Sequence, residues 1–199
     1  MKQKWNDRYS SEEYFFGKEP NDFFKEEIDK ISHGKALFIG DGEGRNSIYA
    51  AKLGWQVDSI DVSDVGKSKA EKLAEENKVK INYIIADALE FNYPKEAYDL
   101  VAVIYFHADE ELREQFHKHI YDALKPNGKL IYLVYDKDHL KLNTNGPSSL
   151  NLLYSLENIV EDFIDLDFEL LKKEKISRVK NGIQQESIII KFVGKKLGL

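Results

Sequence analysis

The feature that most constrains the fold of this chain is a regular alternation of short apolar runs with segments of helical periodicity. The apolar runs are rich in β-branched and aromatic residues and predict strands at 35–39, 55–60, 81–85, 98–104 and 129–135. The helical segments between them are 44–53, 63–77 and 109–124. Alternation of this kind predicts a parallel sheet covered by helices on both faces.

The segment 109–124 carries the clearest helical pattern. Apolar residues recur there every four positions, which places them on one face of a helix; they are Leu112, Phe116, Ile120 and Leu124. We expect Asp109 to cap the start of this helix. We expect Pro126-Asn127-Gly128 to end it and to turn the chain into the next strand.

The C-terminal part departs from the alternation. A helix near 155–165, with Ser155 as its expected cap, precedes two β-rich runs at 168–178 and 183–192. These runs are joined by Lys180-Asn181-Gly182, and an Asn-Gly pair between two such runs is typical of a β-hairpin. The sheet is therefore expected to finish with an antiparallel strand.

Composition excludes several classes of protein. The net charge is −6, with acidic and basic residues interspersed, so the basic footprint of a nucleic-acid-binding protein is absent. No apolar stretch approaches the ~20 residues that cross a membrane. There is no cysteine, which excludes disulfides, thiolate metal ligands and a cysteine nucleophile. We expect no metal site, because His117 and His119 are two residues apart and point to opposite faces of a helix.

These properties predict a protein that acts on a small molecule. The 199 residues are expected to form one domain, as a monomer or weak homodimer. The first residues, MKQKWNDRYSSEEYFF, lack the apolar segment of a secretion signal, so we expect a cytoplasmic protein.

A glycine-rich turn follows the first predicted strand. In FIGDGEGRNS, residues 38–47, Gly40, Gly42 and Gly44 alternate, at the edge where open α/β sheets bind ligands. The dinucleotide pattern G-x-G-x-x-G would need glycine where Arg45 stands, and the triphosphate pattern G-K-[S/T] is absent. The turn therefore favours a ligand without a pyrophosphate. The alternative is an ordinary strand–helix connection.

Two aspartates follow the next two predicted strands. Asp61 lies 21 residues after Gly40, and an acidic residue at about this separation accepts hydrogen bonds from ribose hydroxyls. The alternative is that Asp61 caps the next helix, although Ser63 is better placed for that. Asp87 is expected to accept from an adenine amino group beside the backbone N–H of Ala88; its alternative is a solvated loop position. Together these features describe an adenosine pocket, as for S-adenosylmethionine.

The order of elements and the stretches FIGDGEGRNS, DSIDVS, IIADALEF and ALKPNGKLIYLVY resemble the class I S-adenosylmethionine-dependent methyltransferases over nearly the whole chain. WNDRYSSEEYFFGKEPNDFF, IDVSDVG, IYFHADEELR and LLYSLENIVEDF are similar to the branch of tellurite-resistance and thiopurine methyltransferases. The resemblance implies a Rossmann-like fold, with a seven-stranded, mostly parallel sheet and an antiparallel last strand. It also implies S-adenosylmethionine as cofactor. The residues expected to bind it are Trp5, Tyr9, Phe16, Gly40, Asp41, Gly42, Gly44, Arg45, Asn46, Asp61, Val62, Asp87, Ala88, Ile104 and Tyr105.

The chain departs from the family pattern at three places. Phe38 stands where the family has an acidic residue that helps to hold the methionine amino group. Asp41 replaces a frequent cysteine, and we expect it to compensate in part. Gln184 or Gln185 takes a place near the substrate where the nearest branch tends to have glycine and histidine.

The N-terminal arm, residues 1–34, is rich in aromatic residues and includes a helix expected around 21–31. The resemblance implies that Trp5, Tyr9 and Phe16 fold over the cofactor as a lid. Aromatic faces attract cations such as a sulfonium by ~0.5–2 kcal/mol. The alternative is that the rings pack the helix onto the sheet. Arg8 is expected to pair with a carboxylate of a ligand or with a surface acid.

Methyl transfer needs a nucleophile held in line with the methyl carbon, and it needs a base only where the acceptor loses a proton. His107, after the fourth predicted strand, is the candidate base or substrate orienter; its alternative is a helix cap. The D/N-P-P-Y/W motif of nucleic-acid amino-methylating enzymes is absent. The segment 136–154 is expected to cover the acceptor, with His139, Asn145 and Tyr154 as contacts.

Three functions fit these observations. The first is methyl transfer to a small molecule, such as a soft sulfur, selenium or tellurium nucleophile or a small metabolite. A second is a non-catalytic S-adenosylmethionine-binding homologue, which Phe38 and the two glutamines favour. A third is a nicotinamide-dependent oxidoreductase, against which Arg45 and the terminal hairpin argue.

Overall fold

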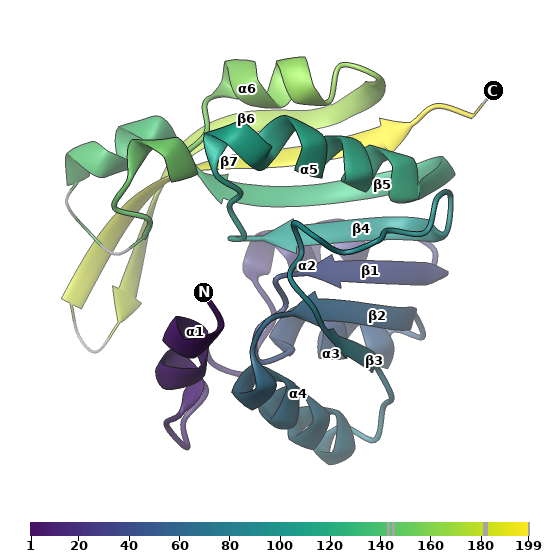
Figure 1. Ribbon diagram of the computed structural model, residues 1–199, viewed down its shortest axis with the longest axis vertical. Coiled ribbons are helices and arrows are strands. Elements are labelled where there is room, and N and C mark those ends of the chain that lie inside the picture. The colour runs from purple at the N-terminus through teal and green to yellow at the C-terminus, as the bar shows by residue number, and fades with distance from the viewer. Residues whose placement is uncertain (143, 145, 181–182, 199) are drawn as a thin grey trace.

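A seven-stranded sheet with the order β3-β2-β1-β4-β5-β7-β6 forms the centre of the protein (Figure 1). The computed structural model describes residues 1–142, 144, 146–180 and 183–198. The strands are β1 (Lys35–Ile39), β2 (Gln56–Asp61), β3 (Asn82–Ile85), β4 (Tyr98–Ile104), β5 (Leu124–Tyr135), β6 (Leu166–Lys180) and β7 (Ile183–Lys196).

The described helices are short, with six α-helices and two 3-10 helices. The α-helices are α1 (Lys2–Tyr9), α2 (Asp22–Ile28), α3 (Arg45–Lys52), α4 (Asp64–Glu76), α5 (Glu110–Ala123) and α6 (Leu156–Asp162). The 3-10 helices are η1 (Lys137–Leu142) and η2 (Leu150–Leu152). None of these helices has the length and apolar character that a membrane crossing requires.

The alternation of side chains along the strands separates two cores. In β1, Leu37 and Ile39 join a cluster with Phe116 of α5 and with Phe163, which directly follows α6. Ala36 and Phe38 face the other way and join a second cluster, whose members from α2 include Phe24 and Ile28. Because successive residues of a strand point to opposite faces, a fully apolar strand such as KALFI needs helices on both sides. Figure 1 shows this layered arrangement.

The position of the site follows from the strand order. β1 pairs in parallel with both β2 and β4. The strands that follow β1 are therefore added first on one side of it and then on the other. The carboxyl ends of β1 and β4 therefore frame the crevice in which open α/β sheets bind ligands. The turns that follow β1, β2 and β4 all contribute residues to the pocket at this edge.

The fold confirms the predicted class: the sheet is mostly parallel, and β7 pairs antiparallel with both β5 and β6. The hairpin residues Asn181 and Gly182 lie outside the described residues. Ser155 caps α6 through a capping box, as expected. Ser63 caps α4 by accepting from the N–H of Gly66, so the predicted competition with Asp61 for this role is decided in favour of Ser63.

Three local expectations are wrong. Asp109 precedes α5 but makes no side-chain capping bond. Pro126-Asn127-Gly128 lie inside β5, because α5 already ends at Ala123 and the strand begins at Leu124. Leu112 is 43% exposed, so it does not belong to the buried face of α5. The arm contains α1, which the sequence gives no reason to expect: it begins without a side-chain cap and has no acidic residue in its first turn.

Candidate functional site

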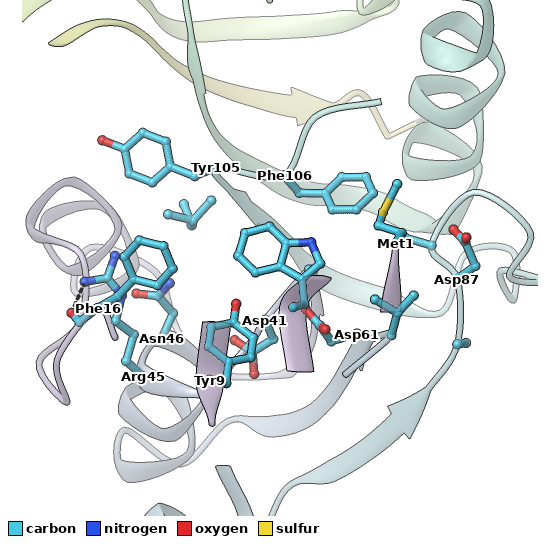
Figure 2. A pocket seen from close by; sticks show the side chains of 16 residues that line it. Met1, Tyr9, Phe16, Asp41, Arg45, Asn46, Asp61, Asp87, Tyr105 and Phe106 are labelled. Atoms are coloured by element: carbon cyan, nitrogen blue, oxygen red, sulfur yellow. Dashed lines mark hydrogen bonds between the residues drawn. The ribbon is translucent and has the colours of Figure 1, made fainter. Parts of the chain in front are cut away.

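A pocket of about 730 Å³, its open mouth included, lies at the carboxyl edge of β1, β2 and β4 (Figure 2). It is lined by Met1, Trp5, Tyr9, Phe16, Gly40, Asp41, Arg45, Asn46, Asp61, Val62, Ala86, Asp87, Ala88, Ile104, Tyr105 and Phe106. These residues include every predicted cofactor contact except Gly42 and Gly44. The structure thus brings the predicted residues together, while their binding role stays a prediction.

The glycine turn after β1 uses the conformational freedom of its glycines. Gly40, Gly42 and Gly44 all have positive φ, at 67°, 60° and 84°, where other residues are strained. They are also closely packed: a Cβ on Gly40 would lie 2.7 Å from Cδ2 of Phe106, and one on Gly42 would lie 2.6 Å from the hydroxyl oxygen of Tyr9. Gly42 and Gly44 therefore shape the pocket from behind its surface.

Asp61 ends β2 and is tied to the glycine turn. Its Oδ2 accepts from the N–H of Gly42 at 2.9 Å, and its Oδ1 accepts from the N–H of Ser63 at 2.9 Å. Burial raises the pKa of Asp61, and these backbone N–H groups oppose the shift. Each carboxylate oxygen can accept a further hydrogen bond. Asp61 is therefore both a structural tie and an acceptor available to a ligand.

Asp41 is a second acid in the pocket. Its Oδ2 accepts from the hydroxyl of Ser59 at 2.9 Å. Burial is the main cause that raises the pKa of Asp41 to about 6, and hydrogen bonds from Ser47 and Ser59 oppose the shift. A carboxylate at the pocket wall attracts a cationic or hydrogen-donating ligand.

Phe38, the departure from the family pattern, does not line the pocket. Its ring is buried and packs edge-on against Phe24 of α2, with ring centroids 5.5 Å apart. Phe38 therefore contributes to the core between the sheet and α2, and it leaves the pocket open.

Asp87 and Ala88 lie in the turn after β3, at the far end of the pocket from Tyr105 (Figure 2). Oδ1 of Asp87 accepts from the N–H of Leu89 at 3.0 Å, which fixes the carboxylate and leaves Oδ2 for other donors. Ala88 is buried, and its carbonyl accepts from the hydroxyl of Tyr93 at 2.7 Å. The geometry agrees with the predicted adenine contacts without testing them.

Aromatic rings of the arm cover the carboxylates. Trp5 stacks on Tyr9 with centroids 5.5 Å apart, and both line the pocket. Phe16 lies under the guanidinium of Arg45, whose Nη1 donates to the carbonyl of Phe16 at 3.0 Å. Arg8 lies outside the pocket lining, with its guanidinium 5.0 Å from the Trp5 ring centroid and 5.1 Å from that of Phe15.

The loop after β4 completes the pocket. Tyr105 has a φ of 62°, which is unusual for a residue with a large side chain and costs roughly 1–3 kcal/mol. Its N–H donates to the carbonyl of Leu133 at 2.7 Å, which helps to hold this conformation. The result is that Tyr105 and Phe106 both face the pocket (Figure 2).

His107 is turned away from the pocket lining. Its Nε2 accepts from the backbone N–H of Tyr135 at 2.9 Å, and its ring stacks on Tyr135. Burial lowers the pKa of His107 to about 3. A base operates best with a pKa near the working pH and an available lone pair. The structure therefore disfavours the general-base role of His107, and its orienting role stays a prediction.

Two predicted acceptor contacts in the segment 136–154 are buried in the fold, while the role of the segment itself stays a prediction. His139 is buried, and its Nδ1 accepts from the N–H of Ile188 at 3.3 Å. Tyr154 is fully buried; its hydroxyl accepts from the N–H of Ala108 at 2.7 Å and donates to the Ala108 carbonyl at 3.0 Å. Neither residue lines the pocket, contrary to expectation if the acceptor binds there. Asn145 lies outside the described residues.

The two C-terminal glutamines are also distant from the pocket lining. Gln184 is exposed and Gln185 is half-buried, and both lie on the part of β7 beyond its pairing with β5. They pair there with β6 in the extended hairpin.

A buried polar network supports the loop after β4. Oδ2 of Asp162 accepts from Nε of Arg113 at 2.6 Å and contacts Nδ1 of His117 at 2.7 Å. Nε2 of His117 lies 2.7 Å from the hydroxyl of Tyr132, whose ring is parallel to that of Tyr154. The network thus links α5, α6 and β5 to the residue that holds Ala108.

This network and three of the pocket residues were not predicted. Phe106 follows a predicted contact and has the same aromatic character, so the signal was present. Met1 and Ala86 carry no such signal. Among the described residues, no three histidine, aspartate or glutamate side chains cluster as metal ligands would.

The pocket fits a cationic adenosine compound. Three carboxylates, Asp41, Asp61 and Asp87, line it against one guanidinium, that of Arg45. Aromatic rings lie beside these carboxylates, and both kinds of group attract a positive charge.

Comparison with known proteins also indicates a methyltransferase domain. Residues 36–128 match the family model described as "Methyltransferase domain". Thiocyanate methyltransferase 1 of Brassica oleracea is 30% identical over 105 residues, which are 51% of this chain and 46% of that protein. The chain thus spans about half the length of this curated relative.

Solved structures share the fold over most of the chain. A structure from work on the conversion of a disulfide bond into a thioacetal group in echinomycin biosynthesis has a TM-score of 0.78 at 17% identity and covers 99% of this chain and 92% of its own. TehB from Haemophilus influenzae has a TM-score of 0.73 at 20% identity, with coverage of 87% and 61%. An S-adenosylmethionine-dependent methyltransferase from Methanosarcina mazei has a TM-score of 0.71 at 16% identity, with coverage of 86% and 97%.

Fold and family match together indicate the class of protein. Residues 36–128 match a methyltransferase domain, and the fold is shared with solved S-adenosylmethionine-dependent methyltransferase structures. The predicted resemblance is thereby confirmed.

Proposed function

We propose that this chain transfers a methyl group from S-adenosylmethionine to a small acceptor, with a soft sulfur, selenium or tellurium nucleophile as the favoured class and another small metabolite as the alternative. The observation that carries the proposal is Asp61, fixed by the glycine turn at the base of a pocket lined by acids and aromatic rings. The named activity of the Brassica oleracea relative supports a soft acceptor.

In this proposal the acids divide the contacts to the adenosine part. Asp61 accepts from the two ribose hydroxyls with the lone pairs that Gly42 and Ser63 leave available. Asp87 accepts from the adenine amino group through Oδ2, because Leu89 already occupies Oδ1. Asp41 faces the positive charge of the methionine end and supplies the acid that Phe38 does not.

When bound, S-adenosylmethionine supplies an electrophilic methyl group on a sulfonium sulfur. Trp5, Tyr9, Phe16 and Tyr105 present aromatic surface to that positive charge, worth ~0.5–2 kcal/mol for each well-placed ring. The same rings exclude water from the reacting atoms, so that the acceptor rather than water is held near the methyl carbon.

The acceptor gains a bond to carbon as the carbon–sulfur bond breaks, with both electrons of that bond passing to the sulfur. A soft anion such as thiocyanate or hydrosulfide carries a nucleophilic lone pair at neutral pH, so a general base is not required. This agrees with a loop in which Nε2 of His107 is already bonded to Tyr135. The chain's part in the reaction is then binding, orientation and exclusion of water.

The test is a calorimetric titration with S-adenosylmethionine and S-adenosylhomocysteine, with NAD as a control ligand. We expect both sulfur compounds to bind and NAD not to bind. Asp61→Ala should raise their dissociation constants by about 100-fold, because hydrogen bonds to a charged group are lost. Asp165→Ala, at an exposed position after α6, is the matched control and should leave both constants unchanged.

Acceptor identity follows from turnover with labelled cofactor. Thiocyanate, hydrosulfide, a small thiol, selenite and tellurite form one series, and a phenol and an amine form a second. Faster labelling of the first series would support the soft-nucleophile class. Tight cofactor binding with no turnover in either series would favour the non-catalytic homologue, and binding of NAD alone would revive the oxidoreductase.

A further inference from the structure

Glu43 and Lys69 form a buried ion pair that the proposed chemistry does not use. Oε1 of Glu43 lies 2.5 Å from Nζ of Lys69, and the two side chains are only 3% and 13% exposed. Glu43 is in the glycine turn, between Gly42 and Gly44, and Lys69 is in the middle of α4. Taking two charges out of water is costly, so they need further hydrogen bonds to be stable there.

Those further hydrogen bonds all go to the N-terminal arm. Nζ of Lys69 donates to the carbonyls of Ser11 at 2.8 Å and Glu13 at 2.7 Å, with the Tyr9 carbonyl more distant at 3.3 Å. Oε2 of Glu43 accepts from the backbone N–H of Phe15 at 2.8 Å. The pair therefore binds four backbone groups of the segment 9–15 and uses the full donor capacity of the ammonium group.

Side-chain contacts reinforce this attachment. The hydroxyl of Tyr14 donates to the carbonyl of Lys69 at 2.9 Å, and the Lys69 ammonium lies 4.8 Å from the centroid of the Tyr14 ring. Tyr9 is buried at the start of the segment, with its hydroxyl against Gly42. The segment 9–15 is thus attached to the glycine turn and to α4 at once.

The first part of the arm is attached differently. α1 is held by the ion pair of Lys2 with Asp64, whose side chains are 52% and 51% exposed, and by Asn6, whose Oδ1 accepts from the Ser63 hydroxyl at 2.7 Å. Exposed ion pairs contribute little, and a helix of eight residues is marginal alone. α1 nevertheless carries Trp5, which lines the pocket.

We propose that Glu43 and Lys69 are positioning residues that anchor the segment 9–15, so that α1 can open and close over the cofactor while the rest of the arm stays in place. The inference rests on the proposed function of the pocket. The anchoring role explains why Glu43 contacts the arm, whereas Asp41 in the same glycine turn lines the pocket.

The test uses hydrogen exchange and calorimetry on the full chain. In the cofactor-free protein, Lys69→Met should increase exchange of the amides of 9–16 by at least tenfold and leave those of β1 and β4 unchanged. The dissociation constant for S-adenosylhomocysteine should rise about tenfold. Lys69→Arg keeps the charge and the donors. It should therefore keep most of the slow exchange of 9–16 and most of the affinity for S-adenosylhomocysteine. Lys72→Met, at an exposed position of the same helix, should change neither.

The outcomes separate the two proposals. Unchanged exchange of 9–16 with affinity within twofold of the natural protein would overturn the anchor, as would faster exchange spread evenly over the sheet, because that marks a general loss of stability. If Lys69→Met does not fold, Glu43→Gln decides by the same two measurements, since it keeps an acceptor for Phe15 and removes the charge. If the unaltered protein binds neither sulfur compound, the proposed function fails, while exchange of 9–16 still decides the anchor.

Discussion

The two sides of the crevice at the carboxyl edge of the sheet use their polar groups in opposite ways. On the side of β1 and β2, Asp41 and Asp61 face a pocket, with pKa values that burial raises. On the side of β4 and β5, His107 and Tyr154 have their polar atoms bonded to the backbone of neighbouring loops. The acids of the first side line the pocket, whereas these two polar groups of the second side hydrogen-bond within the fold.

This difference predicts how each side should respond to substitution. Removal of a group that faces a ligand should chiefly lower the cofactor affinity. Removal of a group that bonds within the fold should change the free energy of unfolding and leave cofactor affinity nearly unchanged. Three substitutions test this division, beginning with the largest expected effect.

Asp162→Asn should lower the free energy of unfolding by about 3–5 kcal/mol, because Arg113 and His117 lose the carboxylate that both contact. Urea denaturation followed by circular dichroism measures the change. Asp122→Asn, on the more exposed side of α5, should cost less than about 0.5 kcal/mol. A cofactor dissociation constant that rose as strongly as for Asp61→Ala would break the division between the two sides.

The cofactor affinity should fall below pH 6 because of Asp41. A cationic ligand favours the ionised carboxylate, so protonation of Asp41, whose pKa is raised to about 6, opposes binding. We expect the dissociation constant for S-adenosylmethionine to rise about tenfold between pH 7 and pH 5. Calorimetry at several pH values measures this, and Asp41→Asn should flatten the profile. A profile equally steep in that variant would assign the effect to another group.

Ionised Asp41 favours cofactor binding but lowers the stability of the folded protein, and the variant Asp41→Asn tests this as well. The folded-state pKa lies above the ordinary value of 3.8, so the protonated form is favoured in the folded protein. The stabilisation that the protonated Asp41 gives to the folded protein is complete below about pH 4 and is lost as the pH rises through 6. At pH 7, Asp41→Asn should therefore raise the free energy of unfolding by about 1 kcal/mol, discounted for the partial exposure of the group.

His107→Asn should have the smallest effect on chemistry. With a pKa near 3 and Nε2 bonded to Tyr135, His107 is neutral throughout the physiological range. We expect kcat to fall less than about tenfold and the pH profile of kcat to keep its shape. Loss of one limb of that profile in the variant would restore the general-base role.

Much of the fold was predictable because the signals were local. The run KALFI is apolar at every position, which requires a strand buried on both faces, and β1 has these bounds. Ser155 and the first turn after it form a capping box, which is encoded within four residues. By contrast, α1 has no cap and few apolar residues, so its helical form depends on contacts with α4.

The pocket was predictable to the extent that strand ends converge at one edge of a parallel sheet. This rule placed Gly40, Asp61 and Asp87 together without knowledge of the fold. It could not foresee that Lys69, among the three lysines of α4, would contact Glu43, or that His117 would contact Asp162, 45 residues away. Such pairs depend on how helices pack, which no short motif records.

The Tyr105 ring lines the pocket at the expense of backbone strain. Its left-handed backbone would suit glycine, and glycine there would relieve roughly 1–3 kcal/mol of strain. The ring that faces the pocket would be lost in the same change. Selection for a more stable protein and selection for a better binder therefore favour different residues at position 105. An attempt to make this chain more heat-resistant by relieving strained residues should leave this one alone.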